Sequence, residues 1–147
     1  MTGRIKELYH KHILSHSKRP FHEGRLEGEG VQSFVAYNPL CGDKFTFYLI
    51  LDDKQRVSEM SFEGFGCAIS RASSSVLVKN TINKTVGEAK SQIMTFLQSL
   101  DAENDTPAED LIKDEELLAF AATREFPERE QCASLGWKAM KEFLLAI

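Results

Sequence analysis

The sequence predicts an α+β domain in which a three-stranded antiparallel sheet packs against about five helices. Three runs of strand-forming residues (31–37, 44–51 and 56–62) follow one another with only short turns between them, which favours antiparallel pairing. From Gly66 onward, the apolar residues recur at helical spacing instead. The length of 147 residues, with 42% hydrophobic and 27% charged residues, is typical of one globular domain spanning residues 1–147.

The N-terminal segment predicts a helix followed by an irregular connection. Residues 3–16 place apolar side chains on one side at helical spacing. These side chains are Ile5, Leu8, Tyr9, His12 and Ile13. Residues 17–30 contain Pro20 and three glycines, which indicates an irregular segment.

The next three segments predict an antiparallel meander. The first strand, residues 31–37, ends at Asn38-Pro39. Residues 44–51 are apolar on both faces, which is typical of a central strand covered on both sides. After a polar turn, residues 56–62 return as the third strand.

The remaining sequence predicts helices. Residues 67–79 have one apolar face, and residues 85–88 form a capping box that opens the next helix. Residues 106–109 repeat that signature, with Pro107 at the favoured first helical position. A final helix is expected from about residue 130 to residue 147.

Charge and cysteine content exclude several classes of protein. The net charge of −4 gives no general affinity for nucleic acid or an anionic membrane. No apolar run is long enough to cross a bilayer, and residues 1–15 are too polar for a secretion signal. Eight of the residues 101–116 are acidic, which predicts a solvated loop and outer helix face. Three cysteines far apart argue against a disulfide framework and favour a reducing, cytoplasmic location with reactive or metal-bound thiols.

Each cysteine lies in a setting that favours the thiolate. Gly42 permits a turn that makes the Cys41 and Asp43 side chains converge, although these residues are equally typical of a simple turn between strands. Cys67 opens a helix, where free backbone N–H groups lower a thiol pKa, and Gly64 and Gly66 allow a close approach of the backbone. The alternative is a buried cysteine that packs the helix start.

Cys132 is expected at the head of the last helix, with Arg129 three residues earlier to stabilise its anion. The alternative is a surface arginine and a core cysteine. Taken together, three sulfurs and one carboxylate are enough to fill a tetrahedral metal site. The same donors suit an iron–sulfur cluster, and the single Asp ligand favours a cluster that can leave.

A cysteine-nucleophile hydrolase is the rival class, and it needs a base beside the thiol. All four histidines lie within the first 22 residues, and none accompanies a cysteine. His12 and His16 are one helical turn apart and are expected to form a surface pair without a third ligand. The serines at 70, 73, 74 and 75 indicate close helix–sheet packing rather than catalysis.

Each cysteine also lies within a longer motif. The motifs are Asn38-Pro39-Leu40-Cys41-Gly42-Asp43, Phe62-Glu63-Gly64-Phe65-Gly66-Cys67-Ala68-Ile69-Ser70 and Phe126-Pro127-Glu128-Arg129-Glu130-Gln131-Cys132-Ala133-Ser134-Leu135. In this order, they look like the three cysteine motifs of the U-type iron–sulfur assembly proteins, the family of IscU-like proteins and NifU N-terminal domains. The chain resembles the SufU branch because of a helical insertion at about 101–126, Trp137-Lys138-Ala139 after the third cysteine, and Gln131 where IscU proteins carry histidine.

The resemblance implies that Cys41, Asp43, Cys67 and Cys132 bind zinc and that Arg129 supports the third cysteine. It implies a pyridoxal-phosphate cysteine desulfurase of SufS type as partner, which delivers sulfur to Cys41, and downstream iron–sulfur assembly proteins. One alternative is a scaffold that builds a [2Fe–2S] cluster on the same ligands. A second alternative is a non-catalytic protein with a structural zinc.

Overall fold

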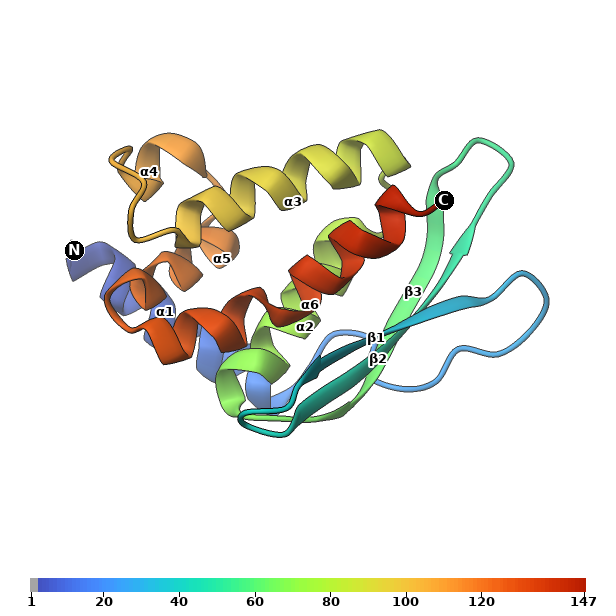
Figure 1. The fold of residues 1–147 in the computed structure, drawn as a ribbon, viewed down its shortest axis with the longest axis horizontal. Coiled ribbons are helices and arrows are strands. Elements are labelled where there is room, and N and C mark those ends of the chain that lie inside the picture. The colour runs from blue at the N-terminus through green and yellow to red at the C-terminus, as the bar shows by residue number, and fades with distance from the viewer. Residues whose placement is uncertain (1–2) are drawn as a thin grey trace.

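A computed structural model describes residues 3–147 and shows an antiparallel sheet with helices packed on one of its faces (Figure 1). The predicted α+β class is confirmed, with six α-helices and one 3-10 helix in these residues in place of about five. In chain order, the elements are α1 (Gly3–Lys18), β1 (Gln32–Asn38), β2 (Asp43–Leu51), β3 (Val57–Phe65), α2 (Ala68–Thr81), α3 (Val86–Leu100), α4 (Ala108–Leu111), α5 (Glu115–Leu118), the 3-10 helix η1 (Ala119–Glu125) and α6 (Pro127–Leu145).

The sheet is the predicted meander, in the order β1-β2-β3 with both pairs antiparallel. The central position of β2 is confirmed, but its cover on both sides is only partial. Lys44 is exposed on the outer face, whereas Tyr48 is buried beside Arg25 and Glu63. Strand β3 runs to Phe65, three residues beyond the prediction. Gly64 permits this extension because it has no side chain and can lie close to β2. A Cβ atom there would lie 2.2 Å from the Lys44 carbonyl oxygen.

Two predicted helix starts differ from the structure. Helix α6 begins at Pro127, three residues before the expected start, with proline in its first turn as the residue favours. The predicted capping signature at 106–109 is wrong: α4 spans four residues, and its N-cap is Pro107, without a side-chain cap. The capping box at Thr85 is confirmed, since both of its hydrogen bonds are present.

The core lies between the sheet and helices α2, α3 and α6. The Trp137 indole stacks on Phe96 with ring centroids 3.9 Å apart, and it donates a hydrogen bond to Ser73 on α2. Helix α6 lies close to the sheet because Gly136 faces Phe47, whose ring would be 2.8 Å from a Cβ atom. The serines of α2 are buried, as close packing requires. Their hydroxyl groups contact α1 and α6, so the close packing is between helices. This packing fixes α6, which carries one of the cysteines.

Helix α1 is attached to the helical layer by a buried histidine. The Nδ1 atom of His16 lies 2.7 Å from the Ser75 hydroxyl on α2, and its Nε2 atom hydrogen-bonds to Glu116 on α5. Lys79 donates to the other oxygen of Glu116 at 2.6 Å. The prediction of a surface pair is therefore wrong for His16, which lies on the buried side of α1 with Ile5, Leu8 and Ile13.

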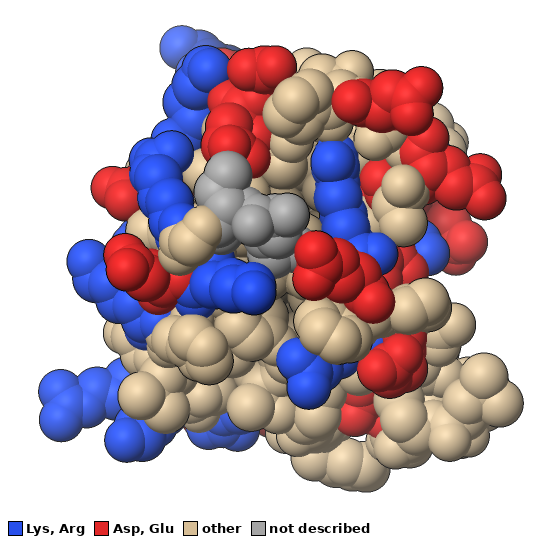
Figure 2. All heavy atoms as spheres, turned by 90° about the vertical axis from the view of Figure 1, so that its left-hand side faces the viewer, with Lys and Arg blue, Asp and Glu red and all other residues tan. Residues whose placement is uncertain are grey.

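The acidic residues 101–116 lie mostly at the surface, as expected for a solvated segment. Figure 2 shows the end of the molecule that carries the start of α1, with most Lys and Arg atoms on one side and most Asp and Glu atoms on the other. Among residues 3–147, no helix combines the length and the apolar character that a membrane crossing needs.

Candidate metal centre

The turn between β1 and β2 presents Cys41 to solvent and holds Asp43 beneath it. Asn38 pairs with Asp43 in the sheet, so residues 39–42 form the whole connection. Gly42 has a positive φ of 78° and donates its backbone N–H to the Asn38 carbonyl at 2.8 Å. Cys41 is exposed, whereas Asp43, the first residue of β2, retains only 4% of its exposure.

Cys67 is the N-cap of α2, as its place after the third strand predicts. Its sulfur accepts a hydrogen bond from the Ser70 backbone N–H at 3.4 Å. Its own backbone N–H donates to Asp43 Oδ1 at 3.1 Å, and its Sγ atom lies 4.0 Å from Asp43 Oδ2. Gly66 makes this contact possible, because a Cβ atom there would lie 2.9 Å from Asp43 Oδ1 and 2.5 Å from the Ser70 hydroxyl. The close approach expected at the glycines is therefore present at both Gly64 and Gly66.

Cys132 does not lie at a helix start. Because α6 begins at Pro127, Cys132 lies in its second turn, where the helix dipole has little effect. Burial raises the pKa of the Cys132 thiol far above its ordinary value, and the hydrogen bond with Cys67 and the charges of Cys67, Asp43 and Cys41 raise it further. The predicted position of Cys132 at the helix start is therefore wrong, and burial opposes the ionisation that the sequence predicts for its thiol.

The four donors nevertheless converge from three separate segments. The Cys41 and Cys132 sulfurs and an Asp43 oxygen all lie within 4.8 Å of one another. Cys67 is outside this compact group, but its Sγ atom lies 4.0 Å from Asp43 Oδ2. Zinc–sulfur bonds of about 2.3 Å place sulfurs about 3.8 Å apart in a tetrahedron, so the Cys41 and Cys132 sulfurs need only a small closure. Three soft sulfur donors and one carboxylate fit Zn²⁺ or an iron–sulfur cluster, and their role as ligands stays a prediction.

Arg129 lies one helical turn before Cys132, on the same side of α6. Its guanidinium carbon lies 4.6 Å from the centroid of the Phe126 ring, and its side chain lines one hollow together with Tyr9 of α1. Tyr9 is a neighbour of the centre that the sequence did not single out. The sequence signal that could have found it is its place one helical turn after Ile5, on the apolar side of the predicted helix.

Large apolar side chains are exposed beside the cysteine motifs. Leu40 is 87% exposed next to Cys41, and Phe65 is 66% exposed two residues before Cys67. Tyr37 and Phe126 are 56% and 40% exposed on the flanking segments. Exposed residues of this size beside a reactive centre are typical of a protein-binding surface.

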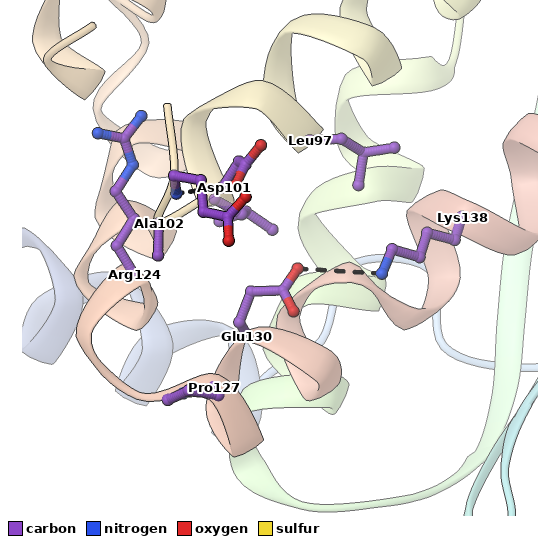
Figure 3. A pocket seen from close by; sticks show the side chains of 9 residues that line it. Leu97, Asp101, Ala102, Arg124, Pro127, Glu130 and Lys138 are labelled. Atoms are coloured by element: carbon purple, nitrogen blue, oxygen red, sulfur yellow. Dashed lines mark hydrogen bonds and ion pairs between the residues drawn. The ribbon is translucent and has the colours of Figure 1, made fainter. Parts of the chain in front are cut away.

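A separate hollow of about 440 Å³ lies between the end of α3 and the start of α6 (Figure 3). Glu130 and Lys138 face one another there as an ion pair at 4.0 Å. Arg124 also lines this hollow and donates to the Ser99 carbonyl at 2.6 Å. The Glu130 carboxylate is therefore occupied by Lys138, and the cysteine cluster remains the candidate centre.

Comparisons with known proteins identify a family for this chain. Residues 8–133 match the family described as NifU-like N terminal domain. The chain is 35% identical over 140 residues to the "Iron-sulfur cluster assembly scaffold protein IscU" of Streptococcus pyogenes serotype M1, which covers 95% of this chain and 84% of that protein. It is 32% identical over 141 residues to the "Zinc-dependent sulfurtransferase SufU" of Bacillus subtilis, which covers 96% and 92% of the two chains.

Solved structures show the same fold. A putative iron–sulfur cluster assembly scaffold protein for the SUF system from Fervidobacterium islandicum superposes with a TM-score of 0.75 at 29% identity, over 94% of this chain and 97% of that chain. The N-terminal NifU-like protein of Brucella abortus gives a TM-score of 0.77 at 24% identity, over 95% of this chain and 94% of that chain.

Proposed function

The chain belongs to the family of NifU-like N-terminal domains, and from that premise we propose that it is an iron–sulfur cluster assembly protein that accepts sulfur on Cys41. The observation that carries this proposal is how the exposed donors are anchored. Cys41 and Cys67 are both exposed, whereas Asp43 is buried and Cys132 is half-buried. The Cys67 sulfur is held as the N-cap of α2 by the Ser70 backbone N–H, but Cys41 lies on a glycine-containing turn. Cys41 is therefore the exposed sulfur that is best placed to move toward an incoming sulfur donor.

The other donors are suited to hold their positions while Cys41 moves. Asp43 is fixed by its pairing with Asn38 and by the Cys67 backbone N–H, and Cys132 is fixed by the packing of α6. When bound by Cys41, Asp43, Cys67 and Cys132, zinc would supply the positive charge that keeps these sulfurs deprotonated. The zinc-dependent relative from Bacillus subtilis supports this choice of metal.

The sulfur step needs no external oxidant or reductant. The Cys41 thiolate attacks the outer sulfur of a cysteine persulfide on the desulfurase, and the bond between the two persulfide sulfurs breaks. The desulfurase cysteine leaves as a thiolate, and Cys41 carries the transferred sulfur as a persulfide. The partner is a pyridoxal-phosphate cysteine desulfurase of SufS type, and the exposed Leu40, Phe65 and Tyr37 provide apolar area for its docking. Downstream iron–sulfur assembly proteins then receive the sulfur.

Transfer of labelled sulfur tests the assignment of Cys41. The protein is incubated with desulfurase and ³⁵S-cysteine, and the label on the chain is measured on a non-reducing gel. The Cys41→Ser variant is expected to lose more than nine-tenths of the label, whereas Ser33→Ala on the exposed face of β1 retains it. Uptake at the normal rate by Cys41→Ser would exclude Cys41 as the acceptor.

A second candidate function is a scaffold on which a [2Fe–2S] cluster is assembled and transferred. The mixed sulfur and oxygen donor set favours a cluster that can leave, and the relative from Streptococcus pyogenes is named a scaffold. Anaerobic incubation with iron, cysteine and desulfurase distinguishes the two functions. A scaffold develops a visible chromophore that passes to an apo-ferredoxin, whereas a sulfur acceptor binds stoichiometric zinc and stimulates the desulfurase.

A structural zinc protein is the third reading, and it makes a different prediction. Stripping the metal would then unfold the domain, and the chain would leave desulfurase turnover unchanged. The aromatic core around Trp137 and Phe96 is formed without any cysteine, which supports a fold that survives metal removal.

A further inference from the structure

Two of the three cysteines are exposed, yet they differ in what holds them. Cys41 lies on the turn between β1 and β2, and no hydrogen bond to its sulfur is present among residues 3–147. Cys67 is also exposed, but its sulfur accepts a hydrogen bond from the Ser70 backbone N–H at 3.4 Å. A persulfide that approaches this face therefore meets two thiols, and exposure alone does not choose between them.

The Ser70 side chain adds a second hold on Cys67. Ser70 is buried, and its hydroxyl oxygen lies 3.5 Å from the Cys67 sulfur and 3.1 Å from the Cys67 carbonyl oxygen. Gly66 provides the room for this contact, because a Cβ atom there would lie 2.5 Å from the Ser70 hydroxyl oxygen. The hydroxyl is therefore placed to fix both the side chain and the backbone of this cysteine.

The contact between Ser70 and Cys67 does not depend on whether the sulfur carries a hydrogen. A serine hydroxyl both donates and accepts hydrogen bonds. An S–H group of Cys67 donates to the Ser70 oxygen, while the hydroxyl donates to the Cys67 carbonyl. When the sulfur carries no hydrogen, the hydroxyl donates to the sulfur instead. Ser70 therefore holds the side chain in both forms.

The backbone of Cys67 is fixed as well. Its N–H donates to Asp43 Oδ1 at 3.1 Å, and its carbonyl accepts the Arg71 N–H at 3.0 Å as part of α2. A sulfur that attacks a persulfide must line up with the bond between the two persulfide sulfurs, so a thiol that is held in another direction reacts slowly. The anchored Cys67 is thus suited to stay in place, whereas Cys41 on its turn is suited to react.

We propose that Ser70 is a positioning residue that decides which exposed cysteine accepts sulfur: its hydroxyl holds the Cys67 side chain in place and leaves Cys41 as the acceptor. This inference rests on the proposed function, because it concerns the choice of acceptor in that reaction. Without the hydroxyl, Cys67 competes by the same step. Its thiolate attacks the outer sulfur of the desulfurase persulfide, the bond between the two persulfide sulfurs breaks, and the desulfurase cysteine leaves as a thiolate.

Mapping of the transferred sulfur tests the proposal. The three cysteines fall in three different tryptic peptides, residues 26–44, 57–71 and 130–138, so mass spectrometry assigns each alkylated persulfide to one cysteine. Ser70→Ala is expected to raise the persulfide on Cys67, relative to that on Cys41, about three- to tenfold, the range of one hydrogen bond. Ser74→Ala is the matched control, because it removes a buried hydroxyl of α2 that donates to the Ser70 carbonyl rather than to a cysteine.

A second measurement needs neither a metal nor the desulfurase. In NMR spectra of the metal-free protein, the couplings between the Hα and Hβ atoms of Cys67 are expected to show one rotamer in the wild type and in Ser74→Ala. In Ser70→Ala, they are expected to show an average over several rotamers.

Three results would overturn the positioning role of Ser70. They are averaged rotamers of Cys67 in the wild type itself, one rotamer in all three proteins, and an unchanged ratio of persulfide on Cys67 and Cys41 in Ser70→Ala. A wild type that keeps one rotamer of Cys67 but takes up no sulfur would instead contradict the proposed function.

Discussion

Two polar clusters of this protein differ in how their charges are matched. The histidine cluster (His16, Ser75, Glu116 and Lys79) lies between α1, α2 and α5, and its members alternate as donors and acceptors. The cysteine cluster (Cys41, Asp43, Cys67 and Cys132) brings together groups that become anions, with backbone N–H groups nearby. A cluster whose charges are matched stabilises the fold. A cluster of like charges is stable as anions only with a cation, which supports the proposal that it is a ligand site.

The largest expected effect comes from removing the centre of the histidine cluster. His16→Ala leaves the Ser75 hydroxyl and the Glu116 carboxylate without their shared partner, and we expect a loss of about 3 kcal/mol in the free energy of unfolding. Urea unfolding measures it, while sulfur acceptance by the folded protein stays normal. The control is His10→Ala, at an exposed position, where a change within about 0.5 kcal/mol is expected. Equal effects of the two variants would show that the cluster is not a source of stability.

A smaller loss of stability, together with a large loss of zinc affinity, is expected when the cysteine cluster is perturbed. In Gly66→Ala, the new Cβ atom would lie 2.9 Å from Asp43 Oδ1 and 2.8 Å from the Phe45 ring, so the Asp43 carboxylate must move. We expect about 2 kcal/mol of destabilisation from overpacking and at least tenfold weaker zinc binding by chelator competition. Gly87→Ala is the matched control because Thr85 Oγ1, at 4.0 Å, is its nearest neighbour and alanine favours the helix. Unchanged zinc affinity in Gly66→Ala would contradict the role of Asp43.

The smallest effect is a pH dependence confined to the histidine cluster. Burial raises the pKa of Glu116, but the hydrogen bonds from Lys79 and His16 outweigh it and hold the pKa below its ordinary value of 4.5. A carboxyl group with a depressed pKa in the folded state contributes stability above its unfolded pKa and loses it as the pH falls through the folded pKa. The stability advantage of the wild type over Glu116→Gln, about 1 kcal/mol at pH 7, should therefore disappear in acid. Thermal unfolding between pH 7 and pH 3 measures this difference, and a constant gap would contradict the assignment.

The sequence determined most of the architecture because its signals are local. Runs of strand-forming residues set the three strands, and the capping box set the start of α3. Gly42, Gly64 and Gly66 marked the places where the backbone bends or approaches closely. The four candidate donors were also recognisable, since each lies in a short motif whose residue types are visible in the chain.

Only the tertiary structure decided how these donors differ. The position of Cys132 in the second turn of α6, the burial of Asp43 and the hollow shared by Tyr9 and Arg129 depend on packing between segments far apart in sequence. Burial and long-range charge, which set the pKa of Cys132 and the exposure of Cys41, are properties of the packed molecule rather than of neighbouring residues. The same reason explains why His16 reads as a surface residue in the sequence and lies buried between three helices in the fold.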